Sequence, residues 1–450
     1  MRIILAVHCF FPDHVYGTET YTLRLAQHLV DLGHHCIVLS AVFAGEPNRV
    51  ALVTHYEHEG IPVICVDRNH LPAQSLMDSF DQLELEEIYA GIIAKEAPDI
   101  IHINHLMNHS CALPRAASKA RVPMWATLTD FHAFCFNGRL EETGGNICPG
   151  PDATGVHCLA CLGREASNYG WSHTELLEMK LPSVRQFRSF RGLLLHAGIG
   201  SALKAKTMQG LKKRASSQLD AYRLCQGLIT PSAFLEKVFR RQAPDMSYHR
   251  MSFGVDVDRS PKPTRSNGDP LVVGFIGQLT IHKGPDLLIE AFRTLPQGSA
   301  ALRIYGSESQ DPSFAERLKA LSTGLDVSFC GTFPSGDIAT ILAEIDVLVI
   351  PSRWHENSPL VLLNALATHT PVVVSDAEGM TEFVTQGHNG FIFRMGDSKS
   401  LASALKHFVA KPSLAAEMST NTAYPRTTRQ MAEEVEALYR TTRQALANQI

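Results

Sequence analysis

The sequence lacks both long apolar runs and a marked excess of either charge. No apolar stretch approaches the ~20 residues needed to span a bilayer, and the longest candidate, residues 192–203, is interrupted by His196, Gly198 and Gly200. Lys and Arg number 41 and Asp and Glu 45, giving a net charge of −4, so overall charge indicates neither nucleic acid nor membrane as a partner. These absences exclude an integral membrane protein and a largely disordered chain.

The N-terminal segment also lacks the features of a signal peptide. It reads MRIILAVHCFFPDH, an apolar run with no small-residue cleavage site and a Pro-Asp turn behind it, which predicts a first strand and loop. At ~100–200 residues per domain, 450 residues with 45% apolar content predict two to three domains. We therefore expect a cytosolic, multi-domain protein, and an enzyme.

Two series of short apolar runs alternate with helical patterns, one on each side of a Pro-rich stretch at 260–270. This alternation predicts two α/β domains, each doubly wound around a parallel sheet, with ligands at the carboxyl ends of the strands. The first series has strand-like runs at 3–7, 36–39, 62–65, 100–103, 124–128 and 227–229, and helical patterns at 20–32 and 83–96. The second has strand-like runs at 271–276, 302–305, 327–329, 347–350, 371–374 and 390–393, and a helix at 285–292.

The most informative motif is the loop Pro351–Leu360, which follows a buried strand and precedes a helix. Ser358 and Pro359 suit the start of that helix as cap and first residue. Amides at a helix start attract phosphate, and Glu356 on the loop is placed to accept hydrogen bonds from sugar hydroxyls. An ordinary turn with a solvated Glu fits the same residues equally well.

This loop and four other segments resemble the retaining glycosyltransferases of family 4. The resemblance covers most of the chain except roughly 135–225. It implies the GT-B fold, an α/β architecture of two doubly wound Rossmann-like domains facing a central cleft, with the nucleotide-sugar donor on the C-terminal domain and the acceptor on the N-terminal one. The other matching segments are Gly17-Thr18-Glu19, His102 to His105, Gly277 to Gly284, and Glu378-Gly379-Met380-Thr381-Glu382.

The predicted domains follow from this resemblance. Residues 1–259 form the acceptor-side domain, with a Cys-rich and basic insert at 135–225. Residues 260–420 form the donor-binding domain, and 421–450 form a helix that returns to the N-terminal domain. The pair Asp256 and Asp258 is interpreted as a turn, because this fold does not use a metal-binding Asp-x-Asp, and no catalytic metal is expected.

The resemblance implies that Lys283 neutralises the donor diphosphate and that Glu356 contacts the donor sugar. A cation at a helix start opposes the helix dipole, which also argues against a merely solvated Lys283. Two positions depart from the family: Gln278 stands where Arg is usual, and Asn364 stands where a second Glu accepts from the ribose. The predicted donor-binding residues are Gly17, Thr18, Gln278, Lys283, Asn357, Ser358, Pro359, Leu360 and Asn364.

On the acceptor side, Thr129 stands where related sequences often have His. His102, His105 or His132 is a candidate substitute, and Asp130 is a plausible acceptor-orienting carboxylate. The predicted catalytic residues are Glu356, Asp130 and His105. The family's chemistry needs no protein nucleophile, because the acceptor attacks from the side on which the nucleotide leaves, so the protein positions the reactants and stabilises charge.

The expected function is retaining transfer of a hexose from a nucleotide sugar to a glycan or lipid-linked acceptor, in cell-surface polysaccharide biosynthesis. The departures at Gln278, Thr129 and Asn364 leave an alternative open, a catalytically degenerate nucleotide-sugar-binding or scaffold protein. No nucleic-acid partner is expected.

The insert carries two further signals. Cys135, Cys148, Cys158 and Cys161 cluster closely enough to suggest a structural zinc site, with free thiols as the alternative. Residues 180–219 contain many Lys and Arg and no Asp or Glu, which favours an anionic membrane surface or acceptor as the partner, on the inner face of the membrane. A solvated basic helix pair is the alternative for the basic stretch.

Overall fold

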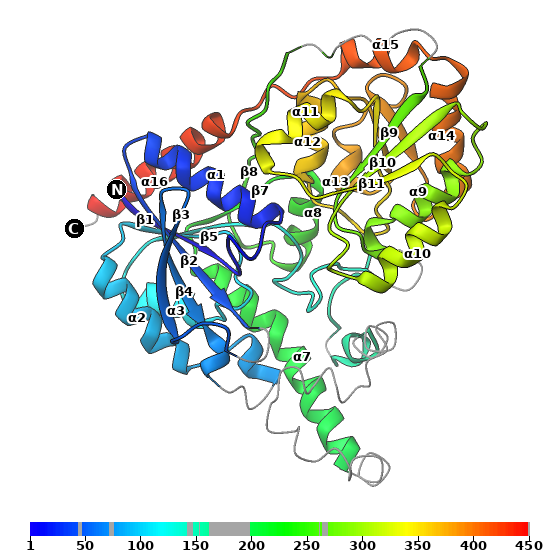
Figure 1. Ribbon diagram of the computed structural model, residues 1–450. Helices are drawn as coiled ribbons and strands as arrows, with labels where there is room; N and C mark the ends of the chain where they lie inside the picture. The colour runs from blue at the N-terminus through cyan, green and yellow to red at the C-terminus, as the bar shows by residue number, and fades with distance from the viewer. Residues whose placement is uncertain are drawn as a thin grey trace.

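The computed structural model describes residues 1–43, 47–71, 76–141, 147–152, 154–161, 199–260, 262 and 269–448, apart from the side chains of 76 and 199–206. The predicted basic residues Arg185, Arg188 and Arg191 lie outside the described part of the chain. Two α/β units with largely parallel sheets form the molecule, as the alternation of strands and helices predicts (Figure 1).

The N-terminal sheet runs in the order β3-β4-β2-β1-β5-β6-β7-β8, parallel throughout except for the β3–β4 hairpin. Its strands other than β3 and β8 are almost fully buried because helices cover both faces. The strands are β1 (Arg2–Val7), β2 (His35–Val42), β3 (Val53–His58), β4 (Ile61–Asp67), β5 (Ile100–Ile103), β6 (Met124–Thr127), β7 (Gly227–Thr230) and β8 (Tyr248–Arg250). The helices are α1 (Gly17–Asp31), α2 (Glu84–Glu96), α3 (Ala112–Lys119), α7 (Ile199–Arg223) and α8 (Ala233–Gln242), with 3₁₀ turns η1 (Arg68–His70) and η2 (Leu76–Ser79).

The C-terminal sheet is parallel, in the order β11-β10-β9-β12-β13-β14. Its strands are β9 (Leu271–Ile276), β10 (Ala300–Tyr305), β11 (Val327–Gly331), β12 (Val347–Ile350), β13 (Val372–Ser375) and β14 (Gly390–Phe393). Its helices are α9 (Pro285–Phe292), α10 (Pro312–Ser322), α11 (Ile338–Ala343), α12 (Leu360–Ala367), α13 (Glu378–Thr381), α14 (Ser398–Ala410) and α15 (Leu414–Asn421), with 3₁₀ turns η4 (Ile281–Lys283) and η5 (Ser335–Asp337).

Each sheet has one place where the strand order reverses. In the first sheet this place lies between β1 and β5, and in the second between β9 and β12. Crevices at such reversals, outside the carboxyl ends of the strands, are where ligands bind in doubly wound folds. The loops after β1, β5, β9 and β12 therefore border the two expected ligand crevices.

The last helix, α16 (Thr428–Ala447), packs against α1 of the N-terminal unit, and Figure 1 shows the two side by side. Its start is fixed by a capping box in which Thr427 and Gln430 bond each other's backbone. The chain therefore crosses between the units twice, once after β8 and once before α16.

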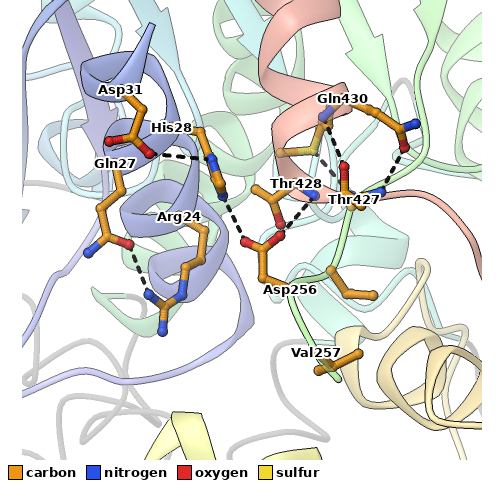
Figure 2. Close-up of polar contacts among 12 residues, drawn as sticks. Arg24, Gln27, His28, Asp31, Asp256, Val257, Thr427, Thr428 and Gln430 are labelled. Carbon is orange, nitrogen blue, oxygen red and sulfur yellow. Dashed lines mark hydrogen bonds and ion pairs between the residues drawn. The ribbon is translucent and has the colours of Figure 1, made fainter. Parts of the chain in front are cut away.

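Asp256 ties these two crossings together, as Figure 2 shows. One carboxylate oxygen accepts from the backbone N–H of Thr428 at 3.2 Å, and the other lies 2.9 Å from Nε2 of His28 on α1. Asp258 instead accepts from Ser260 in a local turn. Only Asp258 is therefore in a local turn, whereas Asp256 contacts residues far away in the sequence.

Candidate functional site

The loops after β9 and β12 bring Lys283 and Glu356 together. Nζ of Lys283 lies 2.6 Å from Oε1 of Glu356, and the lysine also sits over the Trp354 ring, 5.0 Å from its centre. The side chain of Glu356 is only 7% exposed and that of Lys283 22%. Two residues that the sequence predicts at the donor site therefore form one buried ion pair.

Glu356 is held by more than its lysine. The same oxygen accepts from the hydroxyl of Ser352 at 2.6 Å and from the indole N–H of Trp354 at 2.7 Å. Burial alone would raise the pKa of Glu356, but the Lys283 charge and these three hydrogen bonds outweigh burial and hold it below the ordinary value. Glu356 is therefore ionised at neutral pH and fixed in place.

Two close backbone approaches position this loop. A Cβ on Gly284 would lie 2.1 Å from the carbonyl oxygen of Pro351, and one on Gly379 would lie 2.0 Å from that of Glu356. Contacts this short leave room only for glycine. The loop that carries Glu356 is thus clamped between the start of α9 and α13.

Replacing Gly284 with alanine should destabilise the protein more than the same change at Gly387. Both glycines have φ of +73°, but a Cβ on Gly387 would meet nothing within 4 Å. The left-handed backbone costs alanine about 1–2 kcal/mol at either position, and the collision with Pro351 adds about 1–3 kcal/mol at Gly284 alone. Urea unfolding of the two variants measures the difference, and equal losses would contradict the clamp.

Arg353 and Gln278 do not add a second cation beside Lys283. The guanidinium of Arg353 forms two hydrogen bonds with the carboxylate of Asp286, at 2.6 and 3.0 Å, and a third with the carbonyl of Ile281. Gln278 lies half-buried in the loop after β9. Arg353 therefore does not take the place of the arginine that the family usually has at position 278.

The helix after the motif does not begin as the sequence predicts. Pro359 is the N-cap of α12 rather than its first residue, and no side chain caps the helix. Ser358 adopts the left-handed φ of 49°, and its hydroxyl donates to the carbonyl of Pro231 at 3.4 Å. The cap assignment of Ser358 is therefore wrong, because its side chain turns toward the other domain.

Asn357 joins the two domains. Its Oδ1 accepts from the hydroxyl of Ser232 at 2.6 Å, and its Nδ2 donates to the carbonyl of Thr129 at 3.1 Å. Beside it, Glu382 accepts from the backbone N–H of Ala233 at 3.0 Å. The carboxyl ends of both sheets thus meet at this loop, which brings the predicted donor-side and acceptor-side residues together.

The remaining predicted donor-binding residues belong to α1, to α12 and to the cap of α12. Gly17 is exposed at the start of α1, where Tyr16 is the N-cap, and an added Cβ would meet nothing within 4 Å. Thr18 follows half-buried, and its carbonyl accepts from Thr22. The others, Pro359, Leu360 and Asn364, are half-buried in the cap and first turns of α12.

On the N-terminal side, His105 and Asp130 form a pair at 3.0 Å. The backbone N–H of Met107 donates to Nδ1 of His105, so Nε2 carries the ring proton and donates it to Oδ2 of Asp130. The other oxygen, Oδ1, accepts from the backbone N–H of His132 at 2.8 Å. Asp130 is 34% exposed, so it is oriented and still accessible.

His102 is not part of this group, so it does not replace the missing histidine at Thr129. It is fully buried within β5 and bonded to Tyr439 of α16 and to Thr127 at 2.8 Å. Burial lowers its pKa to about 3. The ring of His132 lies 5.1 Å from that of His105. Strand position separates these histidines, because His102 lies within β5 and His105 lies after it.

The four clustered cysteines lie near one another without forming a ligand set. Burial raises the pKa of Cys158 to about 11, and the neighbouring Cys135, Cys148, Asp152 and Cys161 add to the shift. In the part of the chain that the structure describes, no three His, Cys, Asp or Glu side chains are placed to hold a metal ion. The structural zinc stays a prediction.

The described end of the basic segment is partly buried. Arg214 on α7 is 5% exposed and donates to the carbonyl of His132 at 2.7 Å. It therefore supports the turn after β6 and is not available to a membrane surface. No helix among the described residues is both long and apolar enough to cross a bilayer.

A cavity of about 450 Å³ lies elsewhere, between α2 and α3. Half of its ten lining residues are alanine, and none is a predicted site residue. We place the candidate site at the junction around Lys283, Glu356 and Asp130 because ionised and oriented groups gather there.

Comparison with known families finds matches in both domains. The family described as "Glycosyl transferases group 1" matches residues 256–423, and the "Glycosyl transferase 4-like domain" matches residues 16–157. Together these regions take in both sides of the junction. The chain belongs to the group 1, family 4-like glycosyltransferases. The resemblance seen in the sequence is thereby confirmed.

Solved structures show the same fold for this glycosyltransferase. Sucrose-phosphate synthase from Thermosynechococcus elongatus is 17% identical, with a TM-score of 0.63 over 100% of this chain and 98% of that chain. HepE of Anabaena, solved with UDP-glucose, is 18% identical, with a TM-score of 0.60 over 97% of this chain and 100% of that chain. The two-domain GT-B fold expected from the sequence is confirmed.

Curated relatives vary in how much they share with this glycosyltransferase. A 42.6 kDa protein from the cps region of Klebsiella pneumoniae is 23% identical over 85% of this chain and 87% of its own length. The lipopolysaccharide core biosynthesis glycosyltransferase LpsE of Rhizobium meliloti is 35% identical over 36% of this chain and 45% of its own length. The chain thus spans less than half of LpsE in that match.

Proposed function

We propose that this glycosyltransferase transfers a hexose, with retention of configuration, from a nucleotide sugar to a glycan or lipid-linked acceptor in cell-surface polysaccharide biosynthesis. The observation that carries the proposal is the placement of the buried Lys283–Glu356 pair at the loop that contacts Thr129, next to Asp130. A cation for a diphosphate and a carboxylate for a hydroxyl thus lie on facing domains.

Relatives support the substrate class. HepE was solved with UDP-glucose, and LpsE is named for lipopolysaccharide core biosynthesis. Lys283 suits the diphosphate of such a donor because an ammonium forms charge-assisted bonds with phosphate oxygens. When a donor binds, Lys283 can share its three protons between the diphosphate and Glu356.

The setting of Glu356 supports a mechanism without a protein nucleophile. Three donors converge on its Oε1, and they hold its pKa low. A carboxylate stabilised in this way is a weak nucleophile and a weak base. We infer that Glu356 positions the donor sugar, that the acceptor hydroxyl attacks on the side from which the nucleotide leaves, and that a phosphate oxygen takes its proton.

A panel of nucleotide sugars tests the proposal. Each donor is incubated with the protein, with and without a crude lipid and glycan extract, and release of the nucleoside diphosphate is measured. Release that depends on the extract, with an α-linked product from an α-linked donor, is the expected result. Inversion of the linkage would contradict the retaining mechanism.

The same panel separates the enzyme from a degenerate binding protein. Asn364 and Gln278 each remove one charge that the family pattern supplies, and Arg353 is committed to Asp286. A protein that binds nucleoside diphosphates but releases none from any donor with any extract would favour the binding or scaffold role.

We also propose that the basic segment 180–219 attaches the enzyme to an anionic membrane surface, on its inner face. Replacing Arg185, Arg188 and Arg191 with Ser should remove roughly 3 kcal/mol of surface attraction, over a hundredfold in partitioning. Co-sedimentation with vesicles of anionic lipid measures the change, and salt should weaken the binding of the unaltered protein. Equal binding to neutral vesicles would contradict the electrostatic account. The matched control replaces three exposed arginines of the C-terminal domain, Arg293, Arg317 and Arg394, with Ser.

A further inference from the structure

Several buried polar atoms without hydrogen-bond partners gather where β1 and β5 end. Both carboxylate oxygens of Glu19, Nδ1 of His8 and Oδ1 of Asn104 are in this state among the described residues. Glu19 is only 1% exposed, and Nε2 of His8 lies 3.4 Å from its Oε1. Buried polar groups are normally paired, so a cluster of unpaired ones needs an explanation.

This cluster adjoins the acceptor-side pair. The ring of His8 packs on that of His105, with 4.3 Å between their centres, and His105 bonds Asp130. Asn104 donates to Thr22, one turn after Glu19 on α1. His8 follows β1 and Asn104 follows β5, so the cluster occupies the reversal of strand order in the N-terminal sheet.

The charge of the cluster selects its ligand. Glu19 and Asp130 are carboxyl groups. The neighbouring His8 side chain is 16% exposed, and its partial burial together with nearby histidines lowers its pKa well below 6.5 and keeps its ring neutral. Burial raises the pKa of Glu19 against the pull of nearby backbone amides and His105. Such a set accepts hydrogen bonds and disfavours phosphate, so it suits the hydroxyls of a sugar ring.

We propose that Glu19 and His8 bind a hydroxyl of the acceptor sugar and, with Asp130, orient the acceptor toward the donor. This inference rests on the proposed glycosyl transfer and adds the part of the acceptor that the N-terminal domain recognises. A substrate hydroxyl would supply the hydrogen bond that the buried Glu19 carboxylate lacks, and both residues would position the acceptor.

The test uses a substitution that should separate binding from stability. Glu19→Met keeps the size of the side chain and removes the unpaired carboxyl, so its melting temperature should equal or exceed that of the unaltered protein. The probes are methyl α-glucoside, methyl α-mannoside and methyl α-galactoside, measured by saturation-transfer NMR with saturating UDP. At least one should bind the unaltered protein, and Glu19→Met should weaken it at least tenfold.

Controls distinguish the possible failures. Glu84→Met, at an exposed carboxylate on α2, should leave glycoside binding unchanged. His8→Phe should weaken glycoside binding, and His8→Asn, which restores an acceptor atom, should recover most of it. UDP affinity by calorimetry should change less than twofold in every variant. Absence of UDP binding by the unaltered protein would count against the proposed donor instead.

Three outcomes would overturn the proposal of an acceptor subsite at Glu19 and His8. The first is that no glycoside binds the unaltered protein in the presence of UDP. The second is that Glu19→Met binds glycosides normally. The third is a fall in the melting temperature of Glu19→Met with a parallel loss of UDP binding, because that would make Glu19 a structural residue.

Discussion

Replacing Lys283 with alanine should weaken the binding of a nucleoside diphosphate at least tenfold and also destabilise the fold. The lost charge-assisted bond to phosphate is worth about 1.5–3 kcal/mol. The free energy of unfolding should fall by about 3–5 kcal/mol, because Glu356 would remain buried without its cation. Calorimetry with UDP, ADP and GDP, and urea unfolding at neutral pH, measure the two losses.

A second substitution separates these effects. In the double variant Lys283→Ala/Glu356→Gln no buried charge is left uncompensated, so most of the lost stability should return while diphosphate affinity stays low. Lys319 provides a control, because it pairs with Glu308 at 2.7 Å on the exposed surface. Lys319→Ala should cost at most about 1 kcal/mol. Unchanged affinity of Lys283→Ala for every nucleotide would remove Lys283 from the site.

The stability loss of Lys283→Ala should also depend on pH. In the unaltered protein the pKa of Glu356 is lowered, so its stabilising contribution is present above pH 4.5 and is lost as pH falls through the lower folded-state pKa. Without Lys283, burial would raise that pKa, and the destabilisation would shrink as pH falls toward 4.5. Unfolding measured at pH 7 and pH 5 should therefore show the larger deficit at pH 7.

Much of the framework was predictable because its elements are apolar and have clear boundaries. The runs at 271–276 and 285–292 coincide with β9 and α9, since Pro270 and Pro285 mark where each begins. The strands β3 and β8 were not predicted. They are the two edge strands of the sheet and contain only half-buried and exposed residues, so their apolar signal is weak.

The sequence identified members of the site but not their partners. Lys283 and Glu356 each carried a donor-site prediction, yet their pairing joins loops that lie 73 residues apart. Ser358 suited a helix cap locally, but the approach of the N-terminal domain directs its side chain to Pro231. Glu19 lay inside a recognised motif, and only its burial beside His8 distinguishes it from an ordinary residue of a helix's first turn.

Arg214 shows that tertiary packing decides whether a basic residue is available to bind a membrane surface. Counted along the sequence, it adds to a basic stretch that favours a membrane surface. In the structure it is buried on the inner face of α7 and supports the backbone at His132, whose N–H in turn binds Asp130. A count of Lys and Arg along the sequence treats buried and exposed side chains alike. It therefore could not distinguish Arg214 from basic residues that are accessible to solvent or lipid.

Replacing Asp130 with asparagine should slow glycosyl transfer at least about 100-fold without changing donor affinity. Asp130 accepts from His105 with one oxygen and from the His132 backbone with the other. An Asn side chain has a single acceptor oxygen, so it can satisfy only one of these donors and must turn its NH₂ toward the other. An acceptor misplaced by about 1 Å can lose about 10²-fold in rate.

The measurement uses the donor and extract that give turnover with the unaltered protein. Transfer rates are compared for Asp130→Asn and for Asp326→Asn, which makes the same change at an exposed carboxylate on the C-terminal domain. The affinity for the nucleoside diphosphate should be the same in both variants, since Lys283 is untouched. If Asp130→Asn transfers at the normal rate, Asp130 does not orient the acceptor. If it loses nucleotide binding instead, the carboxylate supports the contact between the domains, where the neighbouring Thr129 receives the bond from Asn357.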